Sequence, residues 1–422
     1  MYKKTILDNG LRIISNNMPK RQSVAVGIWL NVGGRYEDSA QKGISHFLEH
    51  LLFKGSKKYS CRKIKESIEG VGGALNGFTS EELTCYLVKI PNSYWGMSLD
   101  VLSDMVLNPA LPQVEIEKEK GVILEEIKMY KDQPQSYVYE LLDDLLWPNQ
   151  PLGTPIIGSV ESVSSIDRLK LKSFKDEFYN PLNITVSVAG SISHDKLIKA
   201  AQKIFSANKH WQKSDFLRVV EEQKKPQLKL FQKDTEQTHM ALGFHALQRQ
   251  HQLKHALGLL HVILGANMSS RLFNEIREKR GLAYEIGTYV KRYFDTGVFV
   301  VHAGIDNSKV SAAVELILKE LKKAKDVLVT EGEFKRAKDF YLGQLMLALE
   351  DTLDHMLWIG ESTSTIDKTY SISEVIKEVN AVTRSDLRKV ACHIFQEQKM
   401  NLALIGPLKE PEQGLFQQLK ID

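Results

Sequence analysis

The chain has 422 residues, more than a single hydrophobic core usually serves, so two or more domains are expected. Hydrophobic residues make up 43% of the chain and charged residues 26%, the balance of a soluble globular protein. The formal net charge of +4 is too small to indicate a nucleic-acid partner, and no dense run of lysine and arginine is interleaved with aromatic residues. The three cysteines are scattered, which argues against a disulfide framework and against a thiolate zinc site.

The N-terminal stretch MYKKTILDNGLRIIS predicts a β-hairpin, with a strand on each side of the turn residues Asp8, Asn9 and Gly10. It has neither an apolar signal core nor the arginine- and serine-rich composition of a transit peptide. No apolar stretch further along the chain is long enough to cross a membrane. The sequence therefore predicts no membrane insertion, and a cytoplasmic location is the default expectation.

The second half of the chain repeats the pattern of the first half. Four segments each have a counterpart: 23–35 with 239–249, 44–56 with 255–267, 62–75 with 271–284, and 184–197 with 401–414. Two homologous domains of similar size follow, residues 1–210 and residues 229–422. The segment 211–228 is polar and charged and contains Pro226, so it is the expected linker.

Strand and helix patterns are mixed within each half. Residues 83–90 and 297–305 alternate like strands, whereas the amphipathic stretches 115–145 and 308–325 have the spacing of helices. Hairpins and helices follow one another without strict strand–helix alternation. This favours an α+β fold, in which each domain is a mainly antiparallel sheet packed with helices, over a doubly wound parallel sheet.

Residues 46–55, HFLEHLLFKG, place polar side chains in an otherwise apolar helical run. His46 and His50 are four residues apart and share one face of a helix, and Glu49 lies between them on the same side. Two imidazoles at this spacing can bind one zinc ion while the carboxylate reaches a metal-bound water, and the order H-x-x-E-H is that of the inverted zincin motif. The simpler alternative is a helix with two hydrogen-bonded histidines.

The second copy of this helix is apolar at two of the three motif positions. Aligning the two copies sets Leu257 against the first histidine, Leu260 against the glutamate and His261 against the second histidine. A helix at this place in the fold therefore packs well without the polar set. Burying that set without partners is costly, so its presence in the first copy needs a separate explanation.

A catalytic zinc ion needs a third protein ligand. The downstream segment EIEKEKGVILEEIKMYKDQP carries Glu119 and Glu126, seven residues apart and on one helical face. The alternative for this segment is an ordinary solvated, glutamate-rich helix.

HFLEH, followed some seventy residues later by EKGVILEE, resembles the pitrilysin/insulinase-type (inverzincin) zinc metallopeptidases. LDNGLRII, NGFTSEELTCY and the internal duplication fit the same family, and in particular its short-chain branch that includes mitochondrial processing peptidase. The resemblance implies one zinc ion per chain, held by His46, His50 and Glu126, with Glu119 as a supporting acid. The neighbouring Glu125 is the obvious competitor for the ligand position, but it points about 100° away from the shared face.

Two further pieces of the family site are implied by the resemblance. REKRGLAY supplies Arg277 and Tyr284 as substrate-binding and oxyanion-stabilising residues, where the plain alternative is a helix end followed by a strand. GGALNGFTSEELTCYLVKI supplies Asn76 beside a substrate that pairs with an edge strand by β-augmentation. A simple hairpin is an equal competitor for this last segment.

The resemblance implies a zinc metalloendopeptidase that cleaves peptides or unfolded presequence-like segments in a closed chamber, with Glu49 assisting the attack of a zinc-bound water. Larger family members join four such domains in one chain. A two-domain chain is therefore expected to act as a homodimer, or as a heterodimer with a homologous subunit. The alternatives are a non-catalytic core subunit of the same fold and a module that binds peptides without cutting them.

Overall fold

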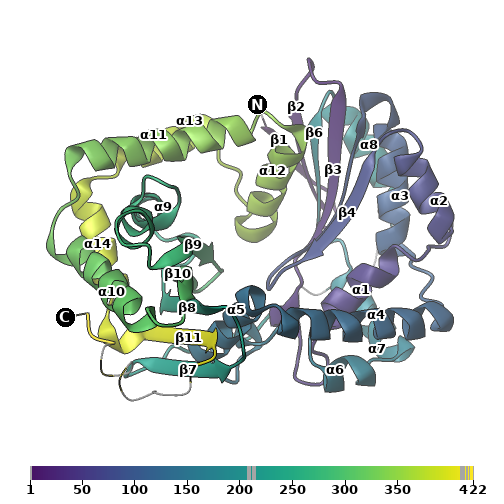
Figure 1. Cartoon of the computed structure of the whole chain (residues 1–422). Coiled ribbons are helices and arrows are strands. Elements are labelled where there is room, and N and C mark those ends of the chain that lie inside the picture. The colour runs from purple at the N-terminus through teal and green to yellow at the C-terminus, as the bar shows by residue number, and fades with distance from the viewer. Residues whose placement is uncertain are drawn as a thin grey trace. The chain divides into compact units, whose positions relative to one another are not determined.

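Figure 1 shows the computed structural model of the chain, in which residues 2–206, 211, 215–408, 414, 417 and 419–421 are described. Residue 210, where the first predicted domain ends, and residues 212–214 of the predicted linker lie outside the described residues. The chain forms two compact units, each assembled from three segments. Unit 1 consists of residues 1–128, 155–217 and 346–372, and unit 2 of residues 129–154, 218–345 and 373–422.

Unit 1 is built on a six-stranded sheet with the order β1-β2-β6-β3-β5-β4. Its strands are β1 (Tyr2–Ile6), β2 (Arg12–Asn17), β3 (Ser23–Leu30), β4 (Ala74–Thr79), β5 (Thr84–Pro91) and β6 (Ile184–Gly190). β2 and β6 are parallel, and the other neighbouring strands are antiparallel. The predicted N-terminal hairpin is β1 and β2. β4 ends the sheet, so one of its edges has no partner strand among the described residues.

Helices cover both faces of this sheet. They are α1 (Ile44–Leu52), α2 (Cys61–Glu69), α3 (Trp95–Leu107), α4 (Gln113–Asp132), α6 (Val160–Ser165), α7 (Arg168–Phe178), α8 (His194–Ile204) and α12 (Thr352–Ile366), with short turns η1 (Gly34–Tyr36) and η2 (Asn92–Tyr94). Alternate residues of a strand point to opposite faces. Ile28 and Leu30 therefore join the core beneath α1 and α3, whereas Trp29 packs with Met356 of α12 on the other face.

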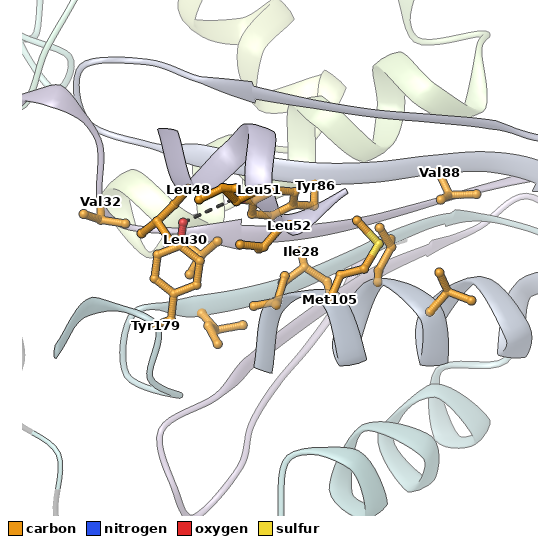
Figure 2. Close-up of a cluster of buried hydrophobic side chains, with 14 of the residues drawn as sticks. Ile28, Leu30, Val32, Leu48, Leu51, Leu52, Tyr86, Val88, Met105 and Tyr179 are labelled. Carbon is orange, nitrogen blue, oxygen red and sulfur yellow. Dashed lines mark hydrogen bonds between the residues drawn. The ribbon is translucent and has the colours of Figure 1, made fainter. Parts of the chain in front are cut away.

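Figure 2 shows the core on the α1 side of the sheet. Leu48, Leu51 and Leu52 of α1 meet strand residues from β3 and β5 there and are fully buried. Each such side chain contributes about 1.5–3 kcal/mol of hydrophobic stabilisation. The hydroxyl groups of Tyr86 and Tyr179 lie 3.2 Å apart and form the hydrogen bond drawn in the figure, so these two buried polar atoms satisfy each other. This core fixes the helix that carries the histidine motif.

Unit 2 is built on a five-stranded sheet with the order β7-β11-β8-β10-β9. The strands are β7 (Gln227–Gln232), β8 (Gln237–His245), β9 (Ala283–Arg292), β10 (Gly297–Asp306) and β11 (Met400–Gly406). The helices and short turns are α5 (Pro134–Leu146), η3 (Pro151–Gly153), α9 (Lys254–Gly265), η4 (Phe273–Glu278), α10 (Val310–Asp326), α11 (Glu331–Ala348), α13 (Ile372–Ala381), α14 (Arg384–Ile394) and η5 (Glu397–Lys399). β7 and β11 are parallel, and the other neighbours are antiparallel.

The two sheets have corresponding strand orders. β7, β11, β8, β10 and β9 match β2, β6, β3, β5 and β4, and the one parallel pair falls at the same place in both sheets. This correspondence supports the duplication inferred from the sequence. The predicted α+β class, with mainly antiparallel sheets and packed helices, is confirmed.

The compact units differ from the continuous domains 1–210 and 229–422 that the sequence predicts, because two segments pack with the other half of the chain. Segment 129–154 belongs to unit 2, where α5 lies against β8 and β11. Segment 346–372 belongs to unit 1, where α12 lies against β2, β3 and β6. Each helix fills an apolar sheet face, and the burial of that face decides the assignment rather than proximity along the chain.

The amphipathic stretch 115–145 is not one helix but two. α4 ends at Asp132, Gln133 is extended, and α5 begins at Pro134. Proline disfavours a helical conformation at the residue before it and suits the first position of a new helix. The break falls near the boundary between the two units. No helix among the described residues is long and apolar enough to span a membrane.

α1 is anchored at its N-terminus by a buried carboxylate. Glu37 is 2% exposed, and its two oxygen atoms accept hydrogen bonds of 2.8 Å from the backbone N–H groups of Gly43 and Ser45. These bonds satisfy donors that the first turn of a helix leaves unpaired. Burial nevertheless raises the pKa of Glu37 to about 7.

Glu37 gives the protein a distinct pH dependence. Because its pKa is about 7 in the folded state against 4.5 ordinarily, the folded protein keeps a proton that the unfolded chain loses between these values. Stability therefore falls as the pH rises through this window. This dependence amounts to at most about 3 kcal/mol in the free energy of unfolding, and Glu37→Gln removes it. Urea denaturation at pH 5 and pH 8 checks this. Glu37→Gln is expected to lose less stability than the wild type between the two pH values; equal losses would contradict the prediction.

Candidate metal centre

α1 separates its apolar and polar residues onto different faces. Its apolar residues are all buried: Ile44, Phe47, Leu48, Leu51 and Leu52. His46, Glu49 and His50 lie at the margin of the core, and each is only partly exposed. Gly43 before the helix has a φ of 89°, and a Cβ atom there would lie 2.6 Å from the carbonyl oxygen of Ile157. The entry to the helix therefore requires glycine.

The two motif histidines and one glutamate converge on a common point. The Nε2 atoms of His46 and His50 lie 3.9 Å and 3.7 Å from Oε2 of Glu126, which comes from α4. One ligand atom from each of the three residues lies within 4.8 Å of the other two. The separations to the carboxylate are too long for hydrogen bonds. They suit ligands that each lie about 2 Å from one shared ion, and two imidazoles with a carboxylate are a zinc donor set. The residues therefore fit zinc.

His50 is oriented by a buried carboxylate. Its Nδ1 atom lies 3.2 Å from Oε2 of Glu119. Glu119 is on the same face of α4 as Glu126, about two helical turns before it. Oε1 of Glu119 forms an ion pair of 2.6 Å with Nζ of Lys54. An Nδ1–H that donates to a carboxylate leaves Nε2 as the free ligand atom, which is the arrangement that supports a metal-bound histidine. Lys54 balances the charge of the buried Glu119.

The protonation state of His46 also suits a ligand. Burial and the neighbouring His50 lower the pKa of His46 to about 4, so its ring is neutral near neutral pH. Neutral imidazole is the form that binds metal ions. The ring centroids of His46 and His50 are 4.6 Å apart. The Nδ1 atom of His46 is buried without a hydrogen-bond partner among the described residues, so His46 has no orienting group like the one that holds His50.

Glu49 does not belong to the three converging residues. Its Oε2 atom accepts a hydrogen bond of 2.7 Å from the hydroxyl group of Thr79, the last residue of β4. Burial raises the pKa of Glu49, and the bond from Thr79 opposes that rise. A carboxylate with a raised pKa beside a metal centre is suited to accept and deliver a proton.

The structure separates the two adjacent glutamates of α4. Glu125 is exposed and forms an ion pair of 2.6 Å with Lys128. Glu126 faces the histidines of α1, as the helical geometry predicts for a residue seven positions after Glu119. Glu125 is therefore the surface member of the pair.

The remaining predicted site residues lie elsewhere on the two units. Asn76 is an exposed residue of the edge strand β4, and its Oδ1 atom accepts a 2.8 Å hydrogen bond from the N–H of Gly77. In unit 2, the guanidinium carbon of Arg277 lies 5.3 Å from the ring centre of Tyr284, which is 74% exposed. The predicted pair is thus in contact. Arg277 lies in a π-helical turn, Phe273–Glu278, an irregularity frequent at functional sites that the sequence pattern does not reveal.

The corresponding helix of unit 2 has the apolar character that the alignment predicts. Leu257 and Leu260 of α9 are buried, and His261 donates to or accepts from the hydroxyl group of Thr288 at 2.7 Å. Burial and the nearby His302 lower the pKa of His261 to about 4. Within the described part of the chain, no second group of three histidine, cysteine, aspartate or glutamate side chains converges as those of unit 1 do.

Sequence reasoning missed three residues that support the site: Glu37, Lys54 and Thr79. Lys54 and Thr79 stand inside or beside the motifs that carry the resemblance, but a lysine near a helix end and a threonine in a strand are too common to single out. Glu37 lies in a loop, and nothing in the sequence indicates that its carboxylate is buried.

Two family models match the chain. Residues 12–160 match the model described as Insulinase (Peptidase family M16), and residues 165–341 match the model described as Peptidase M16 inactive domain. The first match contains the histidine motif and also Glu119 and Glu126 of α4. The second covers most of unit 2.

Curated bacterial proteins are similar over nearly the whole chain. An uncharacterized zinc protease of Bacillus subtilis (strain 168), YmxG, is 37% identical over 407 residues, which are 96% of this chain and 98% of that protein. An uncharacterized zinc protease of Streptomyces coelicolor is 34% identical over 422 residues, 97% of this chain and 90% of its own length.

Solved structures share the fold. A protease from Helicobacter pylori matches with a TM-score of 0.89 at 23% identity, covering 96% of this chain and 99% of that one. A peptidase M16 inactive domain from Pseudomonas fluorescens matches with a TM-score of 0.89 at 16% identity, covering 98% and 99%. The motif-bearing match over residues 12–160 and the full-length similarity to curated zinc proteases together show that this chain belongs to the insulinase (M16) family of peptidases.

Proposed function

We propose that this chain is a zinc-dependent endopeptidase that cleaves peptides or unfolded, presequence-like segments in a closed chamber. The observation that carries the proposal is the convergence of His46, His50 and Glu126 within 4.8 Å, with Glu49 between the two histidines on α1. A carboxylate that is not itself a ligand, next to a zinc donor set, is the arrangement of a hydrolytic rather than a purely structural metal site.

The chemistry divides between the ion and the protein. A bound zinc ion lowers the pKa of water and polarises a carbonyl group. Glu49 takes a proton from the attacking water and gives it to the leaving amine of the scissile peptide bond. Glu119 keeps His50 in the tautomer that leaves its Nε2 atom free.

Further residues are proposed to hold the substrate. Asn76 stands on β4, whose outer edge offers backbone groups to an extended peptide. Arg277 and Tyr284 are proposed to bind the substrate and to stabilise the oxyanion of the transition state. Their mutual contact and the exposure of Tyr284 support a paired role. The cytoplasmic location expected from the sequence stays a prediction.

A non-catalytic core or peptide-binding subunit is the competing function. The family model described as inactive matches residues 165–341, which hold no zinc motif, so that description does not apply to the segment that carries the histidines. Retention of all three candidate ligands and of Glu49 favours catalysis, because a subunit that only binds peptides has no need of a proton carrier beside a metal centre.

The active form is proposed to be a homodimer, with a heterodimer with a homologous subunit as the alternative. Two two-domain chains supply the four domains of a complete chamber, and a two-fold homodimer is the simplest closed arrangement. In this arrangement Arg277 and Tyr284 of one protomer act on the zinc site of its partner.

Zinc binding is expected at about one ion per chain. His50→Ala and Glu126→Gln each change a zinc ligand. Each should weaken zinc binding by more than the roughly 10- to 100-fold typical of losing a residue that only hydrogen-bonds to a ligand. Glu125→Gln is the matched control, because it makes the same change one residue away on the exposed side. Elemental analysis after dialysis against a chelator measures the difference. Full zinc retention by His50→Ala, or a greater loss with Glu125→Gln than with Glu126→Gln, would show that the ligands are wrongly assigned.

Glu49→Gln is expected to keep the fold and the zinc but to lose turnover by about 10²- to 10⁴-fold, since it removes a proton carrier and no ligand. Hydrolysis of a quenched fluorescent peptide, with and without a chelator, measures the effect. The variant should still bind the peptide. Substantial hydrolysis by Glu49→Gln would refute its role, and a wild-type protein without chelator-sensitive hydrolysis would favour the non-catalytic alternative.

Subunit complementation tests the dimer. Glu49→Gln and Tyr284→Phe are each expected to be poorly active, and mixing them in equal amounts should restore about a quarter of wild-type sites if the pair acts across the interface. About half of the dimers are then mixed, and each has one intact site. If the pair acts within one chain, no mixed dimer has an intact site. Activity that stays at the level of the single variants after verified exchange, or a monomeric protein at working concentration, would reject the arrangement.

A further inference from the structure

Thr79 joins the edge strand of unit 1 to the motif helix. It is the last residue of β4, and its hydroxyl group donates the only side-chain hydrogen bond recorded for the carboxylate of Glu49 among the described residues, at 2.7 Å. Thr79 alternates with Phe78 along the strand, so it points to the α1 side of the sheet while Phe78 packs edge-on against Trp29 on the other side. The contact therefore links the strand expected to pair with substrate to the residue expected to move the proton.

The position of Thr79 is fixed by the turn that follows it. Backbone N–H groups of Gly34 and Arg35 donate to the carbonyl oxygens of Ser80 and Glu81, at 3.2 Å and 2.8 Å. The guanidinium group of Arg35 also forms a buried ion pair of 2.7 Å with Glu82. A buried, hydrogen-bonded ion pair is strongly destabilised when one partner moves away, so this turn holds one geometry.

The position of Glu49 depends on the same loop. The loop that holds the β4–β5 turn through Gly34 and Arg35 continues to Glu37, which binds the backbone N–H groups of Gly43 and Ser45 at the start of α1. One segment, residues 34–37, thus anchors both the strand end that carries Thr79 and the helix that carries Glu49. The 2.7 Å hydrogen bond between Thr79 and Glu49 therefore joins two elements, β4 and α1, that are held by the same segment.

We propose that Thr79 is a positioning residue, whose hydroxyl group holds the Glu49 carboxylate in the orientation needed for proton transfer. This inference rests on the proposed peptidase function. The bond from the Thr79 hydroxyl group to Oε2 restricts the rotation of the Glu49 carboxylate. Because a displacement of about 1 Å in a reacting group can reduce turnover on the order of 100-fold, loss of this single bond has a kinetic effect without removing a reacting group.

The test compares substitutions at two paired positions of one hairpin. Thr79→Val keeps the side-chain shape and removes the hydroxyl group, Thr79→Ala does so with a smaller side chain, and Thr79→Ser restores a hydroxyl group. Thr84→Val is the matched control, since Thr84 lies directly opposite Thr79 across β4 and β5 but donates to the carbonyl oxygen of Val32, at 2.9 Å. Each valine variant loses one hydrogen bond that a threonine of the hairpin donates to a group outside it. Only the bond of Thr79 reaches Glu49.

Thr79→Val is expected to lower kcat by about 10-fold or more at equal zinc content, with KM little changed. This is the size of effect typical when a residue that hydrogen-bonds to a group of a metal site is removed. Thr79→Ser should recover most of the activity. Thr84→Val should lower the unfolding midpoint at least as much as Thr79→Val does, but its kcat should stay at the wild-type value. In a Glu49→Gln background, Thr79→Val should cause no further loss of turnover and should leave the Kd for a fluorescent peptide unchanged.

Three outcomes would overturn the inference. A Thr79→Val or Thr79→Ala protein with wild-type kcat would show that the bond is not needed. An equal loss of kcat in Thr84→Val would assign the effect to the stability of the hairpin, and a weakened peptide Kd in the Glu49→Gln background would assign Thr79 to substrate binding. An inactive wild-type protein is distinguishable from all three, because it rejects the proposed function and the inference together.

Discussion

The site depends on one constraint: the polar side chains of His46, Glu49 and His50 lie at the margin of a hydrophobic core. Polar and charged side chains are costly to bury unless each finds a partner, and α1 presents three of them beside five buried apolar residues. The partners come from two other elements: α4 supplies Glu119 and Glu126, and β4 supplies Thr79. The apolar face holds α1 in place against the sheet, and α4, packed through its own buried isoleucines, and β4, paired with β5, bring their polar side chains to the polar face of α1.

The exchange of helices between the two halves of the chain has a related physical origin. Each sheet has an apolar face that is covered by a helix from the other half of the chain: α5 covers the sheet of unit 2, and α12 covers the sheet of unit 1. The break before Pro134 separates α4, which carries the glutamates that face α1, from α5, which begins a separate helix in unit 2.

Much of the fold and of the site could be predicted from the sequence. The spacing of His46 and His50, and the seven-residue interval from Glu119 to Glu126, are helical geometry and predict which residues share a face. Strand alternation predicts β5 and β10 closely. The exchange of α5 and α12 was missed because amphipathicity shows that a helix face will be buried but not against which sheet. Glu37, Lys54 and Thr79 were missed because their roles arise from contacts between segments far apart in the chain, and the π-helical turn at Arg277 has no sequence signal of its own.

The most direct test of the account is the location of zinc by anomalous diffraction at the zinc edge, from a crystal of the zinc-loaded protein. The account predicts one strong peak per chain, bounded by the Nε2 atoms of His46 and His50 and by the carboxylate of Glu126, with a position left open on the side of Glu49. Glu125 should make no contact with the ion. A peak on other residues, a site closed by a fourth protein ligand, or the absence of stoichiometric zinc would contradict the central claim that these two helices form a hydrolytic metal centre.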